Sequence, residues 1–510
     1  MMTELQRIIR DPLSSPIADL AEVRGVAVRS PLHGLARRTL QPIDILAQSV
    51  SAVGPSGVAV TIPPMLAAIA GGSALYALVA AGLMTYLVAS TLNQFSTRIS
   101  ASGSLYTFAA KSIGVGGAFF TACGLALGYG IVILFSLLGC TVVVTGRISG
   151  IGPATLSAMP LIAAAVFILL LVMLGALAVR RVRLSTRIAL VAEIVSISVI
   201  LGLSVWLIVA MGVPSLADVA TVPGPQDAVP FAMATAIAMT AFVGFESAAA
   251  LGPESKRPRA TVPRAIRWTV LIAGLGFLVT TYAELAGFRF AGLGTSIGAH
   301  PADDLAGALG MPGAGAVLDA TIVVSMFACA LAHTTALTRL IFTMAREGVL
   351  PQALGRAHPV FQTPSRAVLV ALPVLGVVPL IAILSGIDIW WLAQEILSGA
   401  IVGFLLAYTL VCIGAPIFLR RIGESTAAVT GRAIAASVLL AGILSLYIGS
   451  QVANGDAVLI AASVGLVAAS SCLWVRARRR RMTVGLYDEV ISADLLTPSG
   501  NDVGRPTRPS

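Results

Sequence analysis

Residues 42–69 read PIDILAQSVSAVGPSGVAVTIPPMLAAI, and this stretch decides how the chain is organised. It is longer than the roughly 20 apolar residues that a helix needs to cross a bilayer. Its middle is interrupted at Gly54, Pro55 and Gly57. Proline removes a backbone donor and glycine permits non-helical angles, and neither apolar half can cross alone. The pattern predicts a broken membrane helix; a packing kink or a contact between small residues is the alternative.

Similar apolar stretches recur along the whole chain. Of its 510 residues, 57% are hydrophobic and 11% are charged, which is too little charge to cover a soluble protein of this length. Nothing alternates like a barrel strand, and isolated strands cannot satisfy their backbone in lipid. We therefore predict an all-α membrane protein with twelve transmembrane helices. The predicted spans are 42–69, 73–96, 115–146, 157–179, 187–212, 228–252, 266–288, 314–344, 367–385, 390–418, 432–451 and 456–475.

Basic residues cluster between alternate spans and near the chain ends. The runs at 180–183, 256–259, 420–421 and 478–481 all fall on one side of the predicted bundle, opposite Arg147 and Arg289. Because lysine and arginine collect on the cytoplasmic side, we expect both termini in the cytoplasm and the protein in the cell membrane. This bias explains the net charge of +10 without a nucleic-acid partner. The bilayer is the expected partner, and the last run suits anionic lipid.

A second interruption lies in the sixth predicted span. Residues 240–247 read TAFVGFES, which places Gly244 and Glu246 in mid-span. Five helices separate the starts of spans one and six, so the two enter from opposite sides, as in an inverted repeat with one broken helix per half. The expected division is a cytoplasmic N-terminal tail at 1–41, five-helix repeats at 42–212 and 228–418, helices eleven and twelve at 432–475, and a disordered cytoplasmic tail at 476–510.

Broken helices free backbone groups that can hold a solute at mid-membrane. N–H groups near Ser56 and Gly57, at the start of the outer half-helix, suit a carboxylate because they lie at the positive end of the helix dipole. Carbonyl groups around Val53 and at residues 242–244 suit an ammonium group. A site with both ends recognises a zwitterion.

Four segments are distinctive when they are taken together. They read PSGVAVTIP at 55–63, ASGSLY at 101–106, FVGFES at 242–247 with ESKRP at 254–258 and VPRAI at 262–266, and MAREGVLP at 344–351 with TP at 363–364. In this order they resemble segments of the amino acid–polyamine–organocation (APC) family. The resemblance covers the chain from about residue 40 to about residue 420. It implies a LeuT-like fold and proton-coupled symport or exchange of amino acids or related amines.

The resemblance also implies where the substrate lies, namely against the broken stretches of helices one and six. The corresponding residues are Gly54, Ser56, Gly57, Phe242, Val243 and Gly244. The chain departs from the family pattern at Pro55 and Ala59, which replace a small residue and an aromatic residue. Thr240 stands where some members place a substrate-stacking tryptophan, which disfavours a cationic substrate held by stacking.

Ionisable groups deep in a membrane are costly unless they are paired or wet, so each is a candidate for function. Glu246 follows the second break, where the family commonly has an acid, and is the first candidate for proton coupling. Glu193 lies in the span where some proton-coupled members carry a lysine in place of a sodium ion; it could take a proton or help bind a cation. The alternatives are a hydrogen-bonded structural acid for Glu246 and a partner of a basic group for Glu193.

Three further polar side chains are candidates. His333, in span eight, lies near where some members place a substrate-facing side chain, and histidine titrates near neutral pH. Ser325 of the same span could supply a hydroxyl to a cation site, and Tyr129 of span three could hydrogen-bond the substrate. A satisfied core residue is the alternative for His333.

These observations predict a secondary transporter that moves an amino acid by alternating access, with a proton, or alternatively sodium, as the coupling ion. A polyamine or organic-amine exchanger of the same fold is the alternative. A membrane enzyme is disfavoured because His33, His300 and His358 lie outside the spans, so no metal cluster can form around His333. The five cysteines show no CxxC spacing, so we expect no disulfide, metal or cofactor. A channel is disfavoured because no repeated filter segment is evident.

Overall fold

The computed structural model describes residues 34–149, 153–180, 182–291 and 314–488. Within these ranges no strand forms, and one isolated bridge joins Leu40 to Ser255. The α-helices are α3 Pro42–Val53, α4 Pro55–Ala70, α5 Ala74–Ser96, α6 Leu105–Ser112, α7 Gly114–Ser149, α8 Pro153–Val179, α9 Val182–Ala210, α10 Leu216–Val219, α11 Ala228–Thr240, α12 Pro258–Phe290, α14 Ala314–Arg346, α15 Ser365–Leu384, α16 Ile389–Arg421, α17 Ala427–Ala453 and α18 Ala457–Arg479. Short 3-10 helices are η1 Gly71–Ser73, η2 Pro225–Asp227, η3 Phe245–Glu254 and η4 Gln352–Gly355.

Eleven helical segments of the described chain are long and apolar enough to cross a membrane. The first, Pro42–Ser96, is 55 residues long and holds the first two predicted spans, which η1 separates. The prediction of an all-α membrane protein is confirmed, while the count of twelve stays a prediction. Several helix ends differ from the predicted limits. For example, α12 begins at Pro258 rather than at 266, because proline in the first turn needs no hydrogen-bond acceptor for its nitrogen.

Local capping explains where several helices begin. Asp388 accepts a hydrogen bond from the Trp391 amide at 2.6 Å and starts α16, and Asp456 does the same for the Leu459 amide at 2.8 Å at the start of α18. Each carboxylate satisfies one of the N–H groups that a first helical turn leaves without a partner. Short polar residues therefore mark helix starts on a chain whose composition is otherwise apolar.

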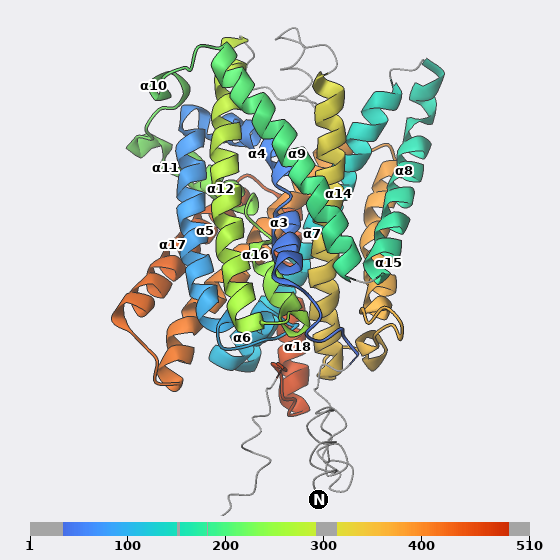
Figure 1. Ribbon diagram of the computed structural model, residues 1–510, viewed down its shortest axis with the longest axis vertical. Helices are drawn as coiled ribbons and strands as arrows, with labels where there is room; N and C mark the ends of the chain where they lie inside the picture. Colours follow the sequence, from blue (N-terminus) through green and yellow to red (C-terminus); the bar gives the residue numbers. More distant parts are fainter. Residues whose placement is uncertain (1–33, 150–152, 181, 292–313, 489–510) are drawn as a thin grey trace, which may run out of the picture.

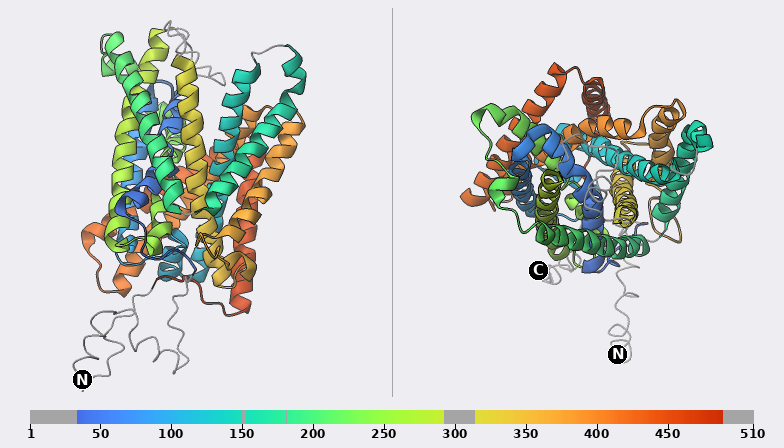
Figure 2. Two further views of the ribbon diagram at one scale, coloured as in Figure 1. Left: turned by 45° about the vertical axis from the view of Figure 1, so that its right-hand side comes forward. Right: turned by 90° about the horizontal axis from the view of Figure 1, so that it is seen from above.

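The long helices lie side by side along the long axis of the molecule (Figure 1). The longest of them, α7, packs against α14, α16 and α18, and forms a central element of the bundle. Seen from above in Figure 2, the other helices surround this centre, and α8 and α15 pack together at the periphery. The broken helix α3–α4 contacts α9, α12 and α14, so both halves are enclosed by neighbouring helices.

The two ends of the described chain meet at one end of the bundle. Arg37 and Arg38 form ion pairs with Asp488, with N–O distances of 2.5 and 3.0 Å. The Asp488 amide also donates to the Ser100 carbonyl at 2.7 Å. Chain ends on the same side are what an even number of membrane crossings produces.

Residues 476–510 are predicted to be disordered, but residues 476–488 of this segment are ordered. Residues 476–479 belong to α18, and residues 482–488, which we call the C-terminal strap, contact the body of the protein. Within the strap, the amides of Gly485 and Leu486 donate to Glu347 Oε1 at 2.8 and 2.7 Å, and Lys111 lies over the Tyr487 ring. These charged partners come from distant parts of the chain, so composition alone does not reveal them. Residues 489–510, like residues 1–33 of the predicted N-terminal tail, lie outside the described residues.

Candidate functional site

The first predicted break is present, and Gly54 makes it. This residue ends α3 and precedes α4 with φ 58° and ψ 52°, a left-handed conformation that glycine adopts at little cost. A Cβ atom at this position would lie 2.9 Å from Cys329 Cβ, so close packing excludes a side chain as well. Pro55 then begins α4, where its missing N–H leaves no acceptor unsatisfied.

The second break lies where α11 ends and η3 begins. Gly244 has φ 106°, and the chain continues as a 3-10 helix from Phe245 rather than as an α-helix. A Cβ atom at Gly244 would lie 2.6 Å from the Ala52 carbonyl carbon, so the second break packs directly against the end of α3. Ser49 Oγ donates to the Phe245 carbonyl at 2.7 Å and fixes this contact. The two predicted breaks therefore lie side by side.

A buried carboxylate approaches the start of α4. Glu193 of α9 has no exposed surface and accepts hydrogen bonds from Ser325 Oγ at 2.7 Å and from Ser56 Oγ at 3.4 Å. The Gly57 amide in turn donates to Ser325 Oγ at 3.0 Å. Four predicted site residues from three helices thus form one hydrogen-bond network at the N-terminal end of α4.

A second buried carboxylate lies at the other break. Glu246 Oε2 accepts hydrogen bonds from the Tyr408 hydroxyl at 2.8 Å and from the Gly244 amide at 3.1 Å, while its Oε1 has no hydrogen-bond partner among the described atoms. Among the described residues, neither Glu193 nor Glu246 forms a salt bridge. Tyr408, which sequence reasoning missed, belongs to α16 and lies 162 residues from its partner.

His333 and Tyr129 are buried neighbours of this region. The His333 ring donates through Nδ1 to the Cys329 carbonyl of its own helix at 3.0 Å, and its Nε2 has no partner among the described atoms. The Tyr129 ring meets the His333 ring edge-on, with centroids 5.6 Å apart. Neither residue lines the cavity between the helix breaks.

That cavity has a volume of about 40 Å³. Among the predicted site residues, Val53, Gly54, Gly57 and Val243 line it. Ser56 and Gly244 lie beside it in the chain but do not line it. Phe242 does not line it either, and packs edge-on against Phe277 of α12, with ring centroids 5.4 Å apart.

Three further residues of the cavity wall were not singled out by sequence reasoning. Phe135 of α7, Met326 of α14 and Leu397 of α16 line the cavity together with residues of the broken helices. Apolar residues occupy every face of these helices, so no pattern distinguishes a residue that faces a cavity from one that faces a neighbour or lipid.

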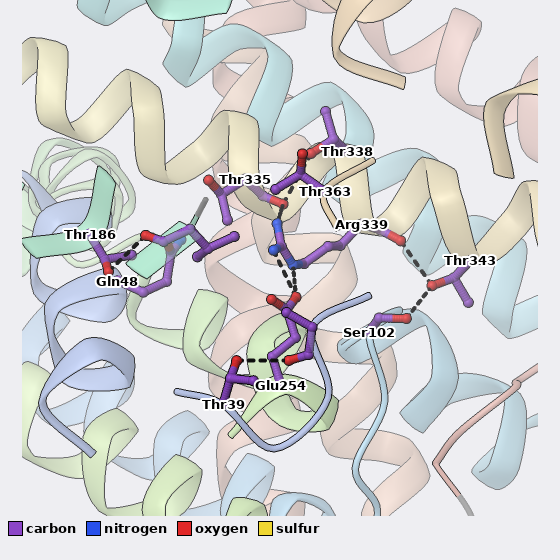
Figure 3. Close-up of polar contacts among 12 residues, drawn as sticks. Thr39, Gln48, Ser102, Thr186, Glu254, Thr335, Thr338, Arg339, Thr343 and Thr363 are labelled. Atoms are coloured by element: carbon purple, nitrogen blue, oxygen red, sulfur yellow. Dashed lines mark hydrogen bonds and ion pairs between the residues drawn. The ribbon is translucent and has the colours of Figure 1, made fainter. Parts of the chain in front are cut away.

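Sequence reasoning also missed Arg339, which is buried in α14. Its guanidinium pairs with Glu254 at 2.7 Å, and both side chains are almost fully enclosed, with 2% and 0% of their surface exposed. Figure 3 shows Arg339 extending from α14 to Glu254, with Thr335 of the same helix accepting a further hydrogen bond at 3.0 Å. The signal was present, because a charged residue inside the predicted span 314–344 requires a partner.

Asp44 is a further buried acid, in the first turn of α3. It accepts a hydrogen bond from Arg187 Nε of α9 at 2.8 Å, and its other oxygen accepts one from the Gln41 amide at the start of α3 at 2.8 Å. The first half of the broken helix, α3, is therefore tied to α9 by an ion pair.

The described residues contain no group of three or more histidine, cysteine, aspartate or glutamate side chains that could hold a metal ion. The polar groups at the breaks are suited to binding and to proton exchange.

Comparison with known proteins gives the family. The methylthioribose transporter of Bacillus subtilis is 25% identical over 357 residues, which cover 67% of this chain and 74% of the transporter. The branched-chain amino acid permease BcaP of Bacillus subtilis is 25% identical over 350 residues, covering 64% of this chain and 71% of the permease. The low-affinity putrescine importer PlaP of Escherichia coli is 28% identical over 316 residues, covering 60% of this chain and 66% of the importer.

The sequence pattern of the amino acid permease family matches residues 44–464, a range that contains both helix breaks and both buried carboxylates. This match confirms the resemblance to the APC family. Both the family and these relatives are transporters rather than enzymes. The chain therefore belongs to the amino acid permease family.

Proposed function

We propose that this permease moves an amino acid across the cell membrane, coupled to a proton, by alternating access. The observation that carries the proposal is the meeting of two helix breaks beside one buried cavity, with two carboxylates that have no cationic partner among the described residues. In this proposal both termini lie in the cytoplasm. Helices α3–α9 and α11–α16 form inverted five-helix repeats of a LeuT-like fold.

The first break supplies the carboxylate end of the substrate site. The N-terminal end of α4, at Ser56 and Gly57, carries the positive end of a 16-residue helix dipole. Carbonyl groups of Val53 and of residues 242–244 supply acceptors for the ammonium group. Together they recognise the part that all α-amino acids share, and the cavity beyond them receives the side chain.

Glu193 couples the substrate to a proton. Through Ser56 and Ser325 its carboxylate already lies at the α4 end that we assign to the substrate. Two anionic carboxylates at the same place repel each other, so a bound substrate favours a proton on Glu193. Release of that proton on the other side of the membrane expels the substrate. The sequence alternative, in which Glu193 pairs with a basic group, has no counterpart among the described ion pairs.

Glu246 couples the proton to movement of the second break. Its carboxylate accepts from the Gly244 amide, at the residue whose backbone ends the helical path of α11. A proton on Glu246 weakens this hydrogen bond and the bond from Tyr408. Both changes act where α11 and η3 join, which is where the two halves of this helix would pivot.

Proteoliposome uptake tests the proposal. Purified protein is supplied with labelled amino acids and amines while proton and sodium gradients are imposed separately. We expect uphill uptake of amino acids with an inward proton gradient and none with sodium alone. Uptake driven only by sodium would contradict proton coupling, and absence of uptake of every amino acid and amine would contradict the proposed function itself.

A further inference from the structure

The cavity beside the helix breaks has apolar walls from four helices. The side chains that form them are Val58, Ile62, Val132, Phe135, Met326 and Leu397. None of the described residues that line the cavity carries a charge. Apolar surface removed from water contributes about 25 cal/mol per Å², so this wall stabilises an aliphatic side chain placed against it.

Three of the four hydroxyl or thiol side chains in the wall already use their hydrogens, and the fourth belongs to Ser136. Thr61 Oγ1 donates to the Gly57 carbonyl at 2.9 Å, and Thr240 Oγ1 donates to the Ile237 carbonyl at 2.6 Å. The Cys329 thiol donates to the Ala52 carbonyl at 3.1 Å. Each hydroxyl or thiol has a single hydrogen, so these three cannot donate to a solute without breaking an existing bond.

No carboxylate of the described residues lies in the cavity wall to pair with a positively charged substrate side chain. Glu193 and Glu246 are absent from its wall, and the hydroxyls that bind them belong to Ser56, Ser325 and Tyr408, which do not line it either. An ammonium or guanidinium group buried without a counter-charge loses its hydration and gains no ion pair in return. The end amine of a polyamine meets the same cost.

We propose that the substrates of this permease are neutral α-amino acids with aliphatic side chains, and that cationic amino acids and polyamines are excluded. The proposal rests on the proposed function and narrows its substrate class. The helix breaks hold the zwitterionic part, and the uncharged cavity selects the side chain.

Met326 sets the size of the side chain that is accepted. It lies in a slot between Gly57 and Gly139, where added Cβ atoms would lie 2.9 Å from Met326 Cγ and 2.5 Å from its Sδ. A cavity of about 40 Å³ holds only a few water molecules, so the substrate displaces part of the wall. Methionine is the most adaptable of these side chains because it is unbranched.

Competition in proteoliposomes tests the substrate class. Uptake of labelled leucine is measured against unlabelled valine, isoleucine, lysine, arginine and putrescine. We expect the aliphatic amino acids to compete at least about 100-fold better than the three cations, which corresponds to about 2.8 kcal/mol. Putrescine or lysine competing as well as isoleucine would overturn the inference and leave amino acid or amine transport intact. If no compound is taken up, the proposed function fails, and thermal stabilisation of the purified protein by the same compounds tests the apolar preference separately.

Two variants test the wall itself. Thr240→Asp places a carboxylate in the cavity, and we expect the relative competition by lysine to rise at least about tenfold. Ser425→Asp, which adds the same charge in an exposed loop, is the matched control. Met326→Ala is expected to admit larger side chains and to raise competition by phenylalanine relative to valine. Unchanged selectivity in both cavity variants, each monodisperse in detergent, would overturn the assignment of this cavity to the side chain.

Discussion

Buried carboxylates are stabilised in different ways in two regions of the molecule. One region is the pair of helix breaks, and the other is the end of the bundle where Arg37 and Arg38 meet Asp488. At the breaks, Glu193 and Glu246 receive hydrogen bonds from hydroxyl groups and from one backbone N–H. At the bundle end, Asp44, Glu254 and Asp488 each form ion pairs with arginine. The acids are equally enclosed in both regions, since each of the five has at most 2% of its surface exposed.

The difference indicates different tasks. An acid that pairs with arginine has a positive partner for its charge, and in the enclosed pair of Glu254 with Arg339, loss of the acid's charge would leave a buried cation uncompensated. An acid bound only by hydroxyls and an amide can take up a proton without leaving such a charge behind. The arginine-paired group is therefore suited to holding helix ends together, and the hydroxyl-bound group is suited to carrying protons.

Breaking the enclosed ion pair between Arg339 and Glu254 has the largest expected effect. Arg339→Met leaves Glu254 buried without its cation and is expected to cost about 3–5 kcal/mol of folding free energy. Thermal unfolding in detergent, followed by tryptophan fluorescence, measures this loss. The double variant Arg339→Met with Glu254→Gln removes both charges and should recover most of the stability. A single variant as stable as the wild type would show that the pair does not hold the two helices.

The second prediction concerns the contact between the two breaks. Gly244→Ala combines a positive φ with a Cβ atom 2.6 Å from the Ala52 backbone, and is expected to cost about 1–3 kcal/mol and to abolish most uptake. Gly276→Ala is the matched control, because a Cβ atom there meets nothing within 4 Å. Equal uptake by the two variants would contradict the close approach of the breaks.

The third prediction concerns the hydroxyl-bound acids. Glu193→Gln and Glu246→Gln keep the shape of each side chain but cannot exchange a proton. Each is therefore expected to lower pH-driven uptake about tenfold or more, which corresponds to about 1.4 kcal/mol. Exchange of labelled for unlabelled substrate, which needs no net proton movement, should persist. Glu395→Gln, at a partly buried acid of α16, is the control. Full pH-driven uptake in either variant would remove that acid from the coupling assignment.

The C-terminal strap has the smallest expected effect. Asp488→Asn weakens two ion pairs whose arginine side chains are 41% and 36% exposed, so we expect a loss of only about 1 kcal/mol. Hydrogen exchange of residues 482–488 should speed up while that of α14 stays unchanged. A loss of stability as large as that of Arg339→Met would remove the distinction between an exposed and an enclosed ion pair at this end of the molecule.

The sequence by itself determined the membrane class, the two helix breaks and the family. These properties depend on local chemistry, since apolar length predicts a span and glycine with proline predicts an interruption wherever the helix is placed. Residues 54–57 and Gly244 were found in this way. Glu193, Ser325 and Ser56 were also named, although their common network could not be predicted from residues more than 130 positions apart.

Only the tertiary structure decided which partner each buried group has. Arg339 meets Glu254 and Tyr408 meets Glu246 because the rotation and depth of separate helices bring them together. Phe135, Met326 and Leu397 face the cavity for the same reason. Hydropathy measures how apolar a helix is. When a helix is apolar on every side, hydropathy does not predict which face points toward the cavity. The packing of the whole bundle decides that face, and with it the walls of the cavity.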